Sequence, residues 1–357
     1  MLKMKKSPIK SREEVKFLSM SRKYPDQFLL AETQSKQEGF EYLYSGMSKK
    51  EIISRISTML GLRSDLGFFG KLKMVKTMVR NFIRIFKGRK EGFKDIHSYY
   101  QELKKSGTLT SSKVSNLIDS YPNKSLWEQL SAYAKHKWKV HIGFTKLPPK
   151  LIFKDKAVLF KHVLICIQEM NKEKIKQAPK IAAGGEVIKT YGTLGLAVND
   201  IARWLRSKGI KSHANHPLGG LVNTPPLAGK AGMGWRGKHG LLITPEFGPR
   251  HRIAPIFIEK KIFKYTDTQE HRWIEQWCET CGKCQRACPT QAIQSNAKVS
   301  IEGIPAIGRT KTCIDREKCF PYFNKTLGCS VCIKVCPFSK GIDAYIRLKN
   351  IVKARDS

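Results

Sequence analysis

The stretch that decides the fold runs from residue 277 to residue 293 and reads WCETCGKCQRACPTQAI. Four cysteines stand in it at the spacing Cys-x2-Cys-x2-Cys-x3-Cys-Pro, from Cys278 to Cys288. Three thiolates so close together can wrap one cubane of iron and sulfide, whereas the fourth, set apart by three residues and followed by proline, reaches a second cubane. The stretch therefore predicts two [4Fe–4S] clusters and a role in electron transfer.

A second motif, Cys329-x2-Cys332-x3-Cys336-Pro337, repeats the end of the first but lacks its first close thiol. Either Cys313 or Cys319 must supply that thiol from the preceding loop. We favour Cys319, because it is nearer and stands before the aromatic run FPYF, which can shield a cluster; Cys313 is then a backup ligand or a free thiol. With the exchange of last cysteines that is typical of bacterial ferredoxins, the expected ligands of the first cluster are Cys278, Cys281, Cys284 and Cys336, and those of the second are Cys288, Cys319, Cys329 and Cys332.

Zinc is the alternative metal, because it also binds Cys-x2-Cys pairs. Zinc needs four ligands per ion, however, and has no use for the third close thiol or for the two Cys-Pro ends, so we favour iron–sulfur clusters. Of the ten cysteines only Cys166 stands outside the segment from Cys278 to Cys336. It lies in an apolar stretch and is predicted to be an inert core thiol.

The cysteines and the N-terminus indicate a reducing compartment. A secreted disulfide protein of this kind would be shorter and would carry a signal peptide. The first six residues, MLKMKK, are basic, but no apolar stretch follows them, and none follows Arg22 in a segment that faintly resembles a twin-arginine signal. No apolar run is long enough to span a membrane. We therefore expect a cytoplasmic protein with reduced thiols and no transmembrane segment.

The charge of the chain is strongly positive, at +37 over 357 residues, with lysines and arginines spread along its whole length. Such a surface attracts polyanions, which include nucleic acid, anionic lipid and an acidic electron donor such as a ferredoxin or flavodoxin. A general enrichment of lysine in the source proteome is the alternative explanation. The length fits two domains or so, and an apolar content of 41% suffices for a core.

We divide the chain into four parts by composition and pattern. They are a mainly helical region of unknown role at 1–125, an α/β domain that is the candidate cofactor domain at 126–265, a ferredoxin-like domain with two [4Fe–4S] clusters at 266–345, and a basic tail at 346–357.

The second part alternates helical and strand patterns. Residues 163–170 read as a buried strand, and residues 191–208 read as an amphipathic helix that Gly209 ends. Residues 240–244 and 253–258 read as two further strands. Together these elements predict an α/β sheet domain.

Residues 71–87 have the pattern of an amphipathic helix, which Asp65 can cap and Gly88 can end. Apolar side chains, including Phe82 and Phe86, cover one half of the helix surface, and basic and polar side chains cover the other. An interfacial membrane helix has this pattern. A helix docked on the protein's own core has it too, so both interpretations stay open.

Residues 231–250 read AGMGWRGKHGLLITPEFGPR and contain the glycine spacing of a dinucleotide-binding fingerprint. That fingerprint needs a strand before it and a helix after it, whereas here a proline-rich loop precedes and a strand follows. The glycines instead favour close approach of the backbone to a flat ligand or to another chain segment. A purely structural loop is the alternative. The segment also offers positive and hydrogen-bonding groups at Lys238, His239 and Arg250.

The glycine-rich segment and the cysteine motifs together resemble the epoxyqueuosine reductase and reductive dehalogenase superfamily. The resemblance rests on residues 231–238 (AGMGWRGK), 241–248 (LLITPEFG) and 328–338 (GCSVCIKVCPF), and it covers about residues 140–345. It implies an α+β fold, in which a nitroreductase-like α/β domain binds cobalamin and a ferredoxin-like two-cluster domain reduces its cobalt. It also implies that a corrinoid would be lined by Gly232, Gly234, Gly237 and Lys238.

The resemblance points to two candidates for the proton donor that such a reduction needs. Epoxyqueuosine reductases carry an aspartate before the glycine-rich segment, but no aspartate stands between Lys211 and Lys230, where His216 and Asn223 lie instead. Dehalogenases use a tyrosine paired with a basic residue, for which Tyr191 is the candidate. We therefore predict His216 or Tyr191 as the catalytic acid, with a capping histidine and a packed tyrosine as the structural alternatives.

The predicted function is that of an iron–sulfur oxidoreductase. Two clusters would feed electrons to a cobalamin-type cofactor, which would reduce a substrate that the sequence does not name. The alternative is an electron-transfer protein of the same fold without a catalytic cofactor. The missing aspartate favours the carrier, and the intact glycine-rich segment favours the reductase.

Overall fold

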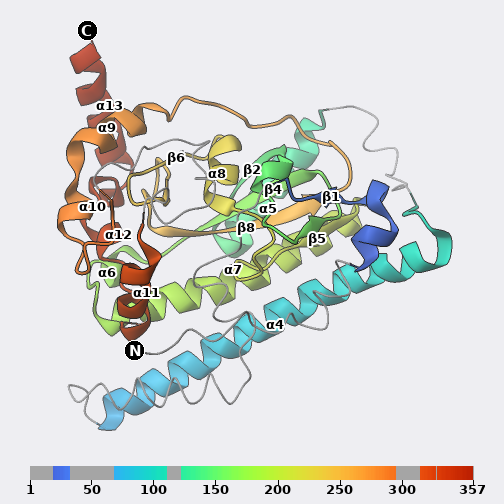
Figure 1. Cartoon of the computed structure of the whole chain (residues 1–357), viewed down its shortest axis with the longest axis horizontal. Coiled ribbons are helices and arrows are strands. Elements are labelled where there is room, and N and C mark those ends of the chain that lie inside the picture. The colour runs from blue at the N-terminus through green and yellow to red at the C-terminus, as the bar shows by residue number, and fades with distance from the viewer. Residues whose placement is uncertain (1–18, 33–67, 111–121, 295–313, 327, 357) are drawn as a thin grey trace.

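The computed structural model describes residues 19–32, 68–110, 122–294, 314–326 and 328–356. A four-stranded antiparallel sheet with the strand order β2-β4-β8-β5 lies at its centre (Figure 1). The strands are β2 (Val140–Lys146), β4 (His162–Glu169), β8 (His251–Ile258) and β5 (Ser212–Ala214). The strands predicted at residues 163–170 and 253–258 are thereby confirmed.

The central strand β4 is apolar along most of its length because helices cover both faces of the sheet. Val163 and Ile165 pack in one core group with Leu227 of α8 (Thr224–Lys230). Leu164 and Cys166 point to the other face and pack with residues of α7 (Ile181–Ser207) and α5 (Lys124–Trp138). Alternate side chains of a strand point to opposite faces, so a strand buried on both sides reads as a continuous apolar run.

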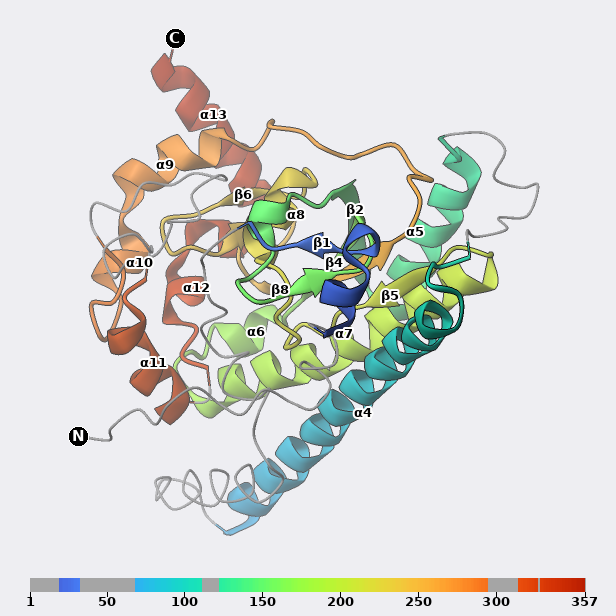
Figure 2. The ribbon, with the colours of Figure 1, turned by 45° about the vertical axis from the view of Figure 1, so that its right-hand side comes forward.

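Helix α7 organises the layers beneath the sheet. It packs against β4, β8 and β5, and α4 (Phe68–Ser106) crosses its outer side (Figures 1 and 2). The helix begins at Ile181 rather than at the predicted Tyr191, because buried residues such as Ala183 and Val187 extend its apolar stripe backwards. Gly209 has a φ of +78° and follows the last turn, as predicted for a helix end.

The described N-terminal residues pack on the α/β part. Met20 and Phe28 belong to the same core group as Leu103 of α4. After a short 3-10 helix, η1 (Pro25–Gln27), strand β1 (Leu29–Leu30) pairs with β3 (Ala157–Val158). The four-part division of the chain stays a prediction, but the first part contributes to the core of the second.

The prediction that Gly88 ends the amphipathic helix is wrong, because α4 runs on to Ser106. Gly88 lies where α4 crosses α7, and a Cβ atom there would be 3.2 Å from the backbone carbon of Gly195. The amide of Asn199 donates to the Gly88 carbonyl at 2.6 Å across the same crossing. Glycine at this point allows two helix backbones to approach closely. The predicted cap, Asp65, lies outside the described residues.

The apolar residues of α4 whose side chains the structure describes form two stripes, one buried and one exposed. Met78, Phe82 and Ile85 are buried, as expected for a helix docked on the protein. A second apolar stripe is exposed to solvent and consists of Leu72 (56% exposed), Val79 (44%), Ile83 (61%) and Phe86 (37%).

The C-terminal helices gather at one side of the sheet (Figure 1). They are α9 (Trp273–Cys281), α10 (Lys283–Arg286), α11 (Arg316–Lys325), α12 (Val331–Val335) and α13 (Ile342–Asp356). The remaining short elements are η3 (Pro149–Leu151), α6 (Lys172–Ile175), η4 (Pro337–Lys340), and the ladder of β6 (Trp235–Arg236) with β7 (Leu242–Ile243). Within the described ranges, none of the helices combines the length and the apolar character needed to cross a membrane.

Candidate iron–sulfur and cofactor site

The first predicted set of cluster ligands meets in one small cavity. Cys278 and Cys281 come from α9, Cys284 comes from α10, and Cys336 follows α12; all four line this cavity. Gly282, at a φ of +56°, makes the turn between the two helices. Burial, together with the neighbouring thiols, raises the pKa of Cys278 to about 12. The protein alone therefore disfavours a thiolate here, and a bound metal would have to draw off the proton.

The second predicted set also lies together. Burial, then the neighbouring thiols of Cys288 and Cys329, raise the pKa of Cys319 to about 11. Cys332 is half-buried beside Cys329, Cys319 and Cys288, and Cys284 of the first set is near it as well. The two sets are thus adjacent, as two clusters in electronic contact require. Cys313, the other candidate for the fourth thiol, lies outside the described residues.

The spread of the thiols suits a cluster better than a single ion. In the parts of the chain that the structure describes, no three His, Cys, Asp or Glu side chains converge closely enough to hold one metal ion. In a [4Fe–4S] cluster each thiolate binds a different iron, so the thiolates stand farther apart than the ligands of one ion. Amides also point at the thiols, since the N–H of Ala292 donates to Cys288 Sγ at 3.3 Å.

The glycines of the glycine-rich segment meet the protein's own chain. Gly232 has a φ of +69° and Gly234 a φ of +149°. A Cβ atom at Gly232 would lie 2.2 Å from the carbonyl oxygen of Thr266, and one at Gly234 would lie 2.1 Å from that of Ile243. At Gly237 it would lie 2.6 Å from the Ile243 side chain. The close approach expected of these glycines is therefore to another chain segment.

Lys238 stands at the first set of cysteines. It is buried, lines the same cavity as Cys278 and Cys336, and donates through Nζ to the carbonyl of Glu279 at 3.5 Å. Its ammonium group places a positive charge beside thiolates that carry negative charge in a cluster.

Tyr191 faces a cation that sequence reasoning missed. The guanidinium of Arg252, on β8, lies 4.8 Å from the centre of the Tyr191 ring, on α7. Tyr191 also packs against the same apolar group as Cys329 and Cys332 of the second set. Arg252 stands directly before the apolar run at residues 253–258, and this position in a buried strand is the one signal in the sequence that could have pointed to it.

Several buried polar atoms near Arg252 have no hydrogen-bond partner among the described residues. They are Nε of Arg252, Nδ1 of His251 and Nε2 of His239. Burial lowers the pKa of His251 to about 3, and the charges of Arg252 and Arg250 add to the effect. A buried polar atom without a partner is costly, so these atoms, between the glycine-rich segment and β8, offer hydrogen-bonding groups to a polar ligand.

His216, the other predicted acid, lies at the crossing of α4 and α7. It is buried, and its Nδ1 accepts a hydrogen bond from the N–H of Leu218 at 3.0 Å. Burial, then the charge of Arg89, lower the pKa of His216 to about 3. The imidazole is therefore neutral at physiological pH. Its catalytic role stays a prediction, and the geometry supports it less than it supports Tyr191.

Comparison with known protein families identifies the cysteine-rich part. Residues 277–339 match the family model of a 4Fe-4S double cluster binding domain. The described cysteines and this match together define a protein with two [4Fe–4S] clusters joined to a mixed helix and sheet domain. Iron–sulfur clusters, rather than zinc, are thereby confirmed.

Similarity to whole proteins extends beyond that domain. The tetrachloroethene reductive dehalogenase of Desulfitobacterium hafniense is 31% identical over 195 residues, which cover 50% of this chain and 33% of that protein. The epoxyqueuosine reductase of Listeria monocytogenes is 25% identical over 258 residues, covering 62% and 66%. The chain is therefore a relative of the reductive dehalogenases and epoxyqueuosine reductases, as its motifs predicted. It spans about a third of the length of the dehalogenases that it matches.

Solved structures support the fold. One of them is a reductive dehalogenase, whose structure is described as suggesting a mechanism for B12-dependent dehalogenation. It superposes with a TM-score of 0.56 at 18% identity, over 68% of this chain and 36% of that one. A catabolic reductive dehalogenase in complex with 3-bromo-4-hydroxybenzoic acid gives a TM-score of 0.51 at 19% identity, over 59% and 32%.

Proposed function

We propose that the chain is an iron–sulfur reductase whose two clusters pass electrons to a cobalamin-type cofactor beside Tyr191 and Arg252. The observation that carries the proposal is the position of this pair. Tyr191 lies under a guanidinium at 4.8 Å and packs against the same apolar group as Cys329 and Cys332. A proton donor and an electron donor thus meet at one place, which a reduction that consumes both requires.

The proposed roles follow from the chemistry of each group. A bound corrinoid supplies a cobalt whose reduced form attacks or reduces a carbon–halogen or epoxide bond. The Tyr191 hydroxyl would give its proton to the substrate, and the Arg252 guanidinium would stabilise the phenolate that remains. His239, His251 and Arg252 would donate to or accept from the polar edge of the cofactor.

The proposal keeps two further predictions that rest on the resemblance. The α/β part is taken as nitroreductase-like, and the glycine-rich segment is taken as one wall of the corrinoid site. Because the side of each glycine that lacks a side chain meets the protein itself, we assign contact with the cofactor to the backbone and to Lys238. A bulky residue at Gly234 would disturb the fold and is unsuitable as a test of binding.

Metal content separates the reductase from the electron carrier. After anaerobic reconstitution with iron, sulfide and hydroxocobalamin, we expect about eight irons per chain, the sum for two cubanes, together with stoichiometric cobalt. Replacing Arg252 with leucine should lower the cobalt content and leave the iron content unchanged. Iron without cobalt in the wild type would contradict the reductase and favour an electron carrier with the same fold.

We also propose that the exposed apolar stripe of α4 lies on an anionic membrane surface. Residues 68–90 contain eight lysines and arginines and no aspartate or glutamate. Lys76, Arg80 and Arg84 line a surface groove together with Leu72, Val79 and Ile83. An apolar stripe flanked by cations is the pattern of an interfacial helix that binds anionic lipid.

Vesicle flotation measures this contact. The double variant Val79→Ser and Ile83→Ser should bind vesicles of phosphatidylcholine and phosphatidylserine at least about ten-fold more weakly, since each buried CH₂ contributes about 0.8 kcal/mol to membrane binding. The matched control, Ile342→Ser and Ile346→Ser, removes exposed apolar side chains from α13 and should float like the wild type. Equal flotation of both variants would exclude α4 as the membrane contact.

A further inference from the structure

A second cavity, of about 370 Å³, lies beside the first set of cysteines and has a strongly cationic lining. Among the residues that the structure describes, no aspartate or glutamate lines it. Its lining cations come from seven separate positions: Lys172, Lys176, Arg250, Lys283, Lys334, Lys340 and Arg347.

Most of this charge is not neutralised inside the protein. Arg250 pairs with Glu169 and Lys176 pairs with Glu173 at 2.8 Å. For the other five cations, no carboxylate of the described residues lies within ion-pair distance. Lys283, Lys334, Lys340 and Arg347 are exposed to solvent, and they come from α10, α12, η4 and α13. The positive charge is thus spread over a surface formed by several elements.

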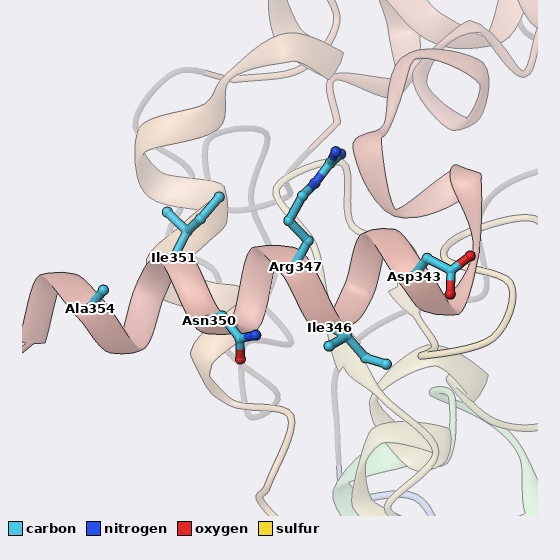
Figure 3. Close-up of a pocket in the computed structure, with 6 residues that line it drawn as sticks. All are labelled: Asp343, Ile346, Arg347, Asn350, Ile351 and Ala354. Atoms are coloured by element: carbon cyan, nitrogen blue, oxygen red, sulfur yellow. The ribbon is translucent and has the colours of Figure 1, made fainter.

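An apolar patch adjoins the cationic cavity. Figure 3 shows it on α13, where Arg347 and Ile351 lie on one side of the helix in this view and Ile346 on the other, with Asp343 and Asn350 at its polar edge. Ile342 (44% exposed), Ile346 (50%) and Ile351 (38%) are unusually exposed for isoleucine. Arg347 and Ile351 line both this patch and the cationic cavity. An apolar centre with a polar rim is the anatomy of a protein–protein interface.

The surface lies directly over the first cluster site. Trp277, Cys336 and Pro337 line the cationic cavity on one side and the cysteine cavity on the other. The cationic cavity therefore reaches one thiol of the first set, Cys336, directly. A redox group docked here would be close to the first cluster, and the second cluster would lie between it and Tyr191.

We propose that this surface, made of the cationic cavity and the patch on α13, docks an acidic electron-donor protein that carries a flavin or an iron–sulfur cluster. The inference rests on the proposed function only in that the first cluster accepts electrons. One electron leaves the reduced donor, which is oxidised by one unit, and enters the first cluster, which is reduced by one unit; no proton or group is transferred. Cations steer an acidic partner to the surface, and the isoleucines hold it once it has docked.

Stopped-flow reduction of the reconstituted protein by reduced flavodoxin tests the proposal. The wild-type second-order rate should fall steeply as ionic strength rises, because screening weakens steering. The variant Lys340→Glu with Arg347→Glu should react at least about ten-fold more slowly at low ionic strength, with a shallower salt dependence. Ile346→Asp should slow the reaction without a comparable loss of salt dependence.

Two controls keep the outcome specific. Lys124→Glu with Lys135→Glu makes the same charge change on α5, which lies away from α13 in both views (Figures 1 and 2), and should react like the wild type. Titanium(III) citrate should reduce the clusters of every variant equally, which separates lost docking from lost clusters. An unaltered rate in the variants at Lys340, Arg347 and Ile346 would overturn the proposal. A change from dimer to monomer in those variants would also overturn it, because it would assign the surface to a second copy of the chain. A wild type without clusters would instead count against the proposed function.

Discussion

Replacing Cys319 with alanine should halve the iron content of the reconstituted chain, from about eight irons to about four. The structure places Cys319 beside Cys288 and Cys329, and Cys332 completes the group. With one of four thiolates removed, the second cluster loses a ligand, while the first keeps Cys278, Cys281, Cys284 and Cys336. Iron and sulfide analysis with EPR spectroscopy of the reduced protein would measure the loss as one missing spin system.

The matched control is Cys313→Ala, which removes the competing thiol six positions earlier in the chain. We expect its iron content to equal that of the wild type. If Cys313→Ala loses half of the iron and Cys319→Ala keeps all of it, the assignment of the fourth ligand is wrong. If either variant loses all of the iron, the two clusters assemble as one unit.

Replacing Tyr191 with phenylalanine should lower the rate of substrate reduction by about 10²- to 10⁴-fold, the usual contribution of a positioned proton donor. The change removes one hydroxyl and keeps the ring, which packs from α7 against the apolar group that includes Cys329 and Cys332. Iron content, cobalt content and cluster reduction by titanium(III) citrate should therefore stay as in the wild type. Halide release from tetrachloroethene and from 3-bromo-4-hydroxybenzoic acid, with reduced methyl viologen as donor, would measure the rate; both compounds are named for relatives or neighbours of the chain.

Tyr133→Phe is the control for this substitution. The Tyr133 hydroxyl donates to Asp200 at 2.6 Å, on the α5 side of α7, so its loss should leave turnover unchanged. If Tyr191→Phe retains full turnover, the proton comes from another group, and His216→Gln becomes the next variant to measure. A shift of the pH profile of turnover in Tyr191→Phe would further mark the hydroxyl as the group that titrates.

Local patterns in the sequence predicted the elements whose partners are close along the chain or whose burial is uniform. The apolar run at residues 163–170 predicted β4, because a strand covered on both faces has apolar side chains at every position. The start of α7 was missed, because small residues at 181–190 carry a weaker helical signal than the apolar stripe that follows. Gly88 was taken for a helix end, since its real function, close contact with Gly195, involves a residue far along the chain.

The candidate site divides in the same way. The cysteine spacing predicted the first ligand set, because Cys278, Cys281 and Cys284 are close neighbours in sequence; in the second set only Cys329 and Cys332 are. Arg252 was not predicted as the partner of Tyr191, because the two residues lie on different elements and meet only when β8 packs on α7.

The cluster chemistry and the family relationship could be predicted from the residues alone, since the spacing of thiols and the glycine-rich segment are local features that do not depend on the fold. The exposed stripe of α4, the cation that faces Tyr191 and the lysines and arginines that gather over the first cluster could be found only in the folded chain. Each of these depends on contacts between segments far apart in the chain, and a net charge of +37 spread along the sequence does not show where the charge collects. Packing of α6, α10, α12 and α13 around the thiols gathers that charge at one surface.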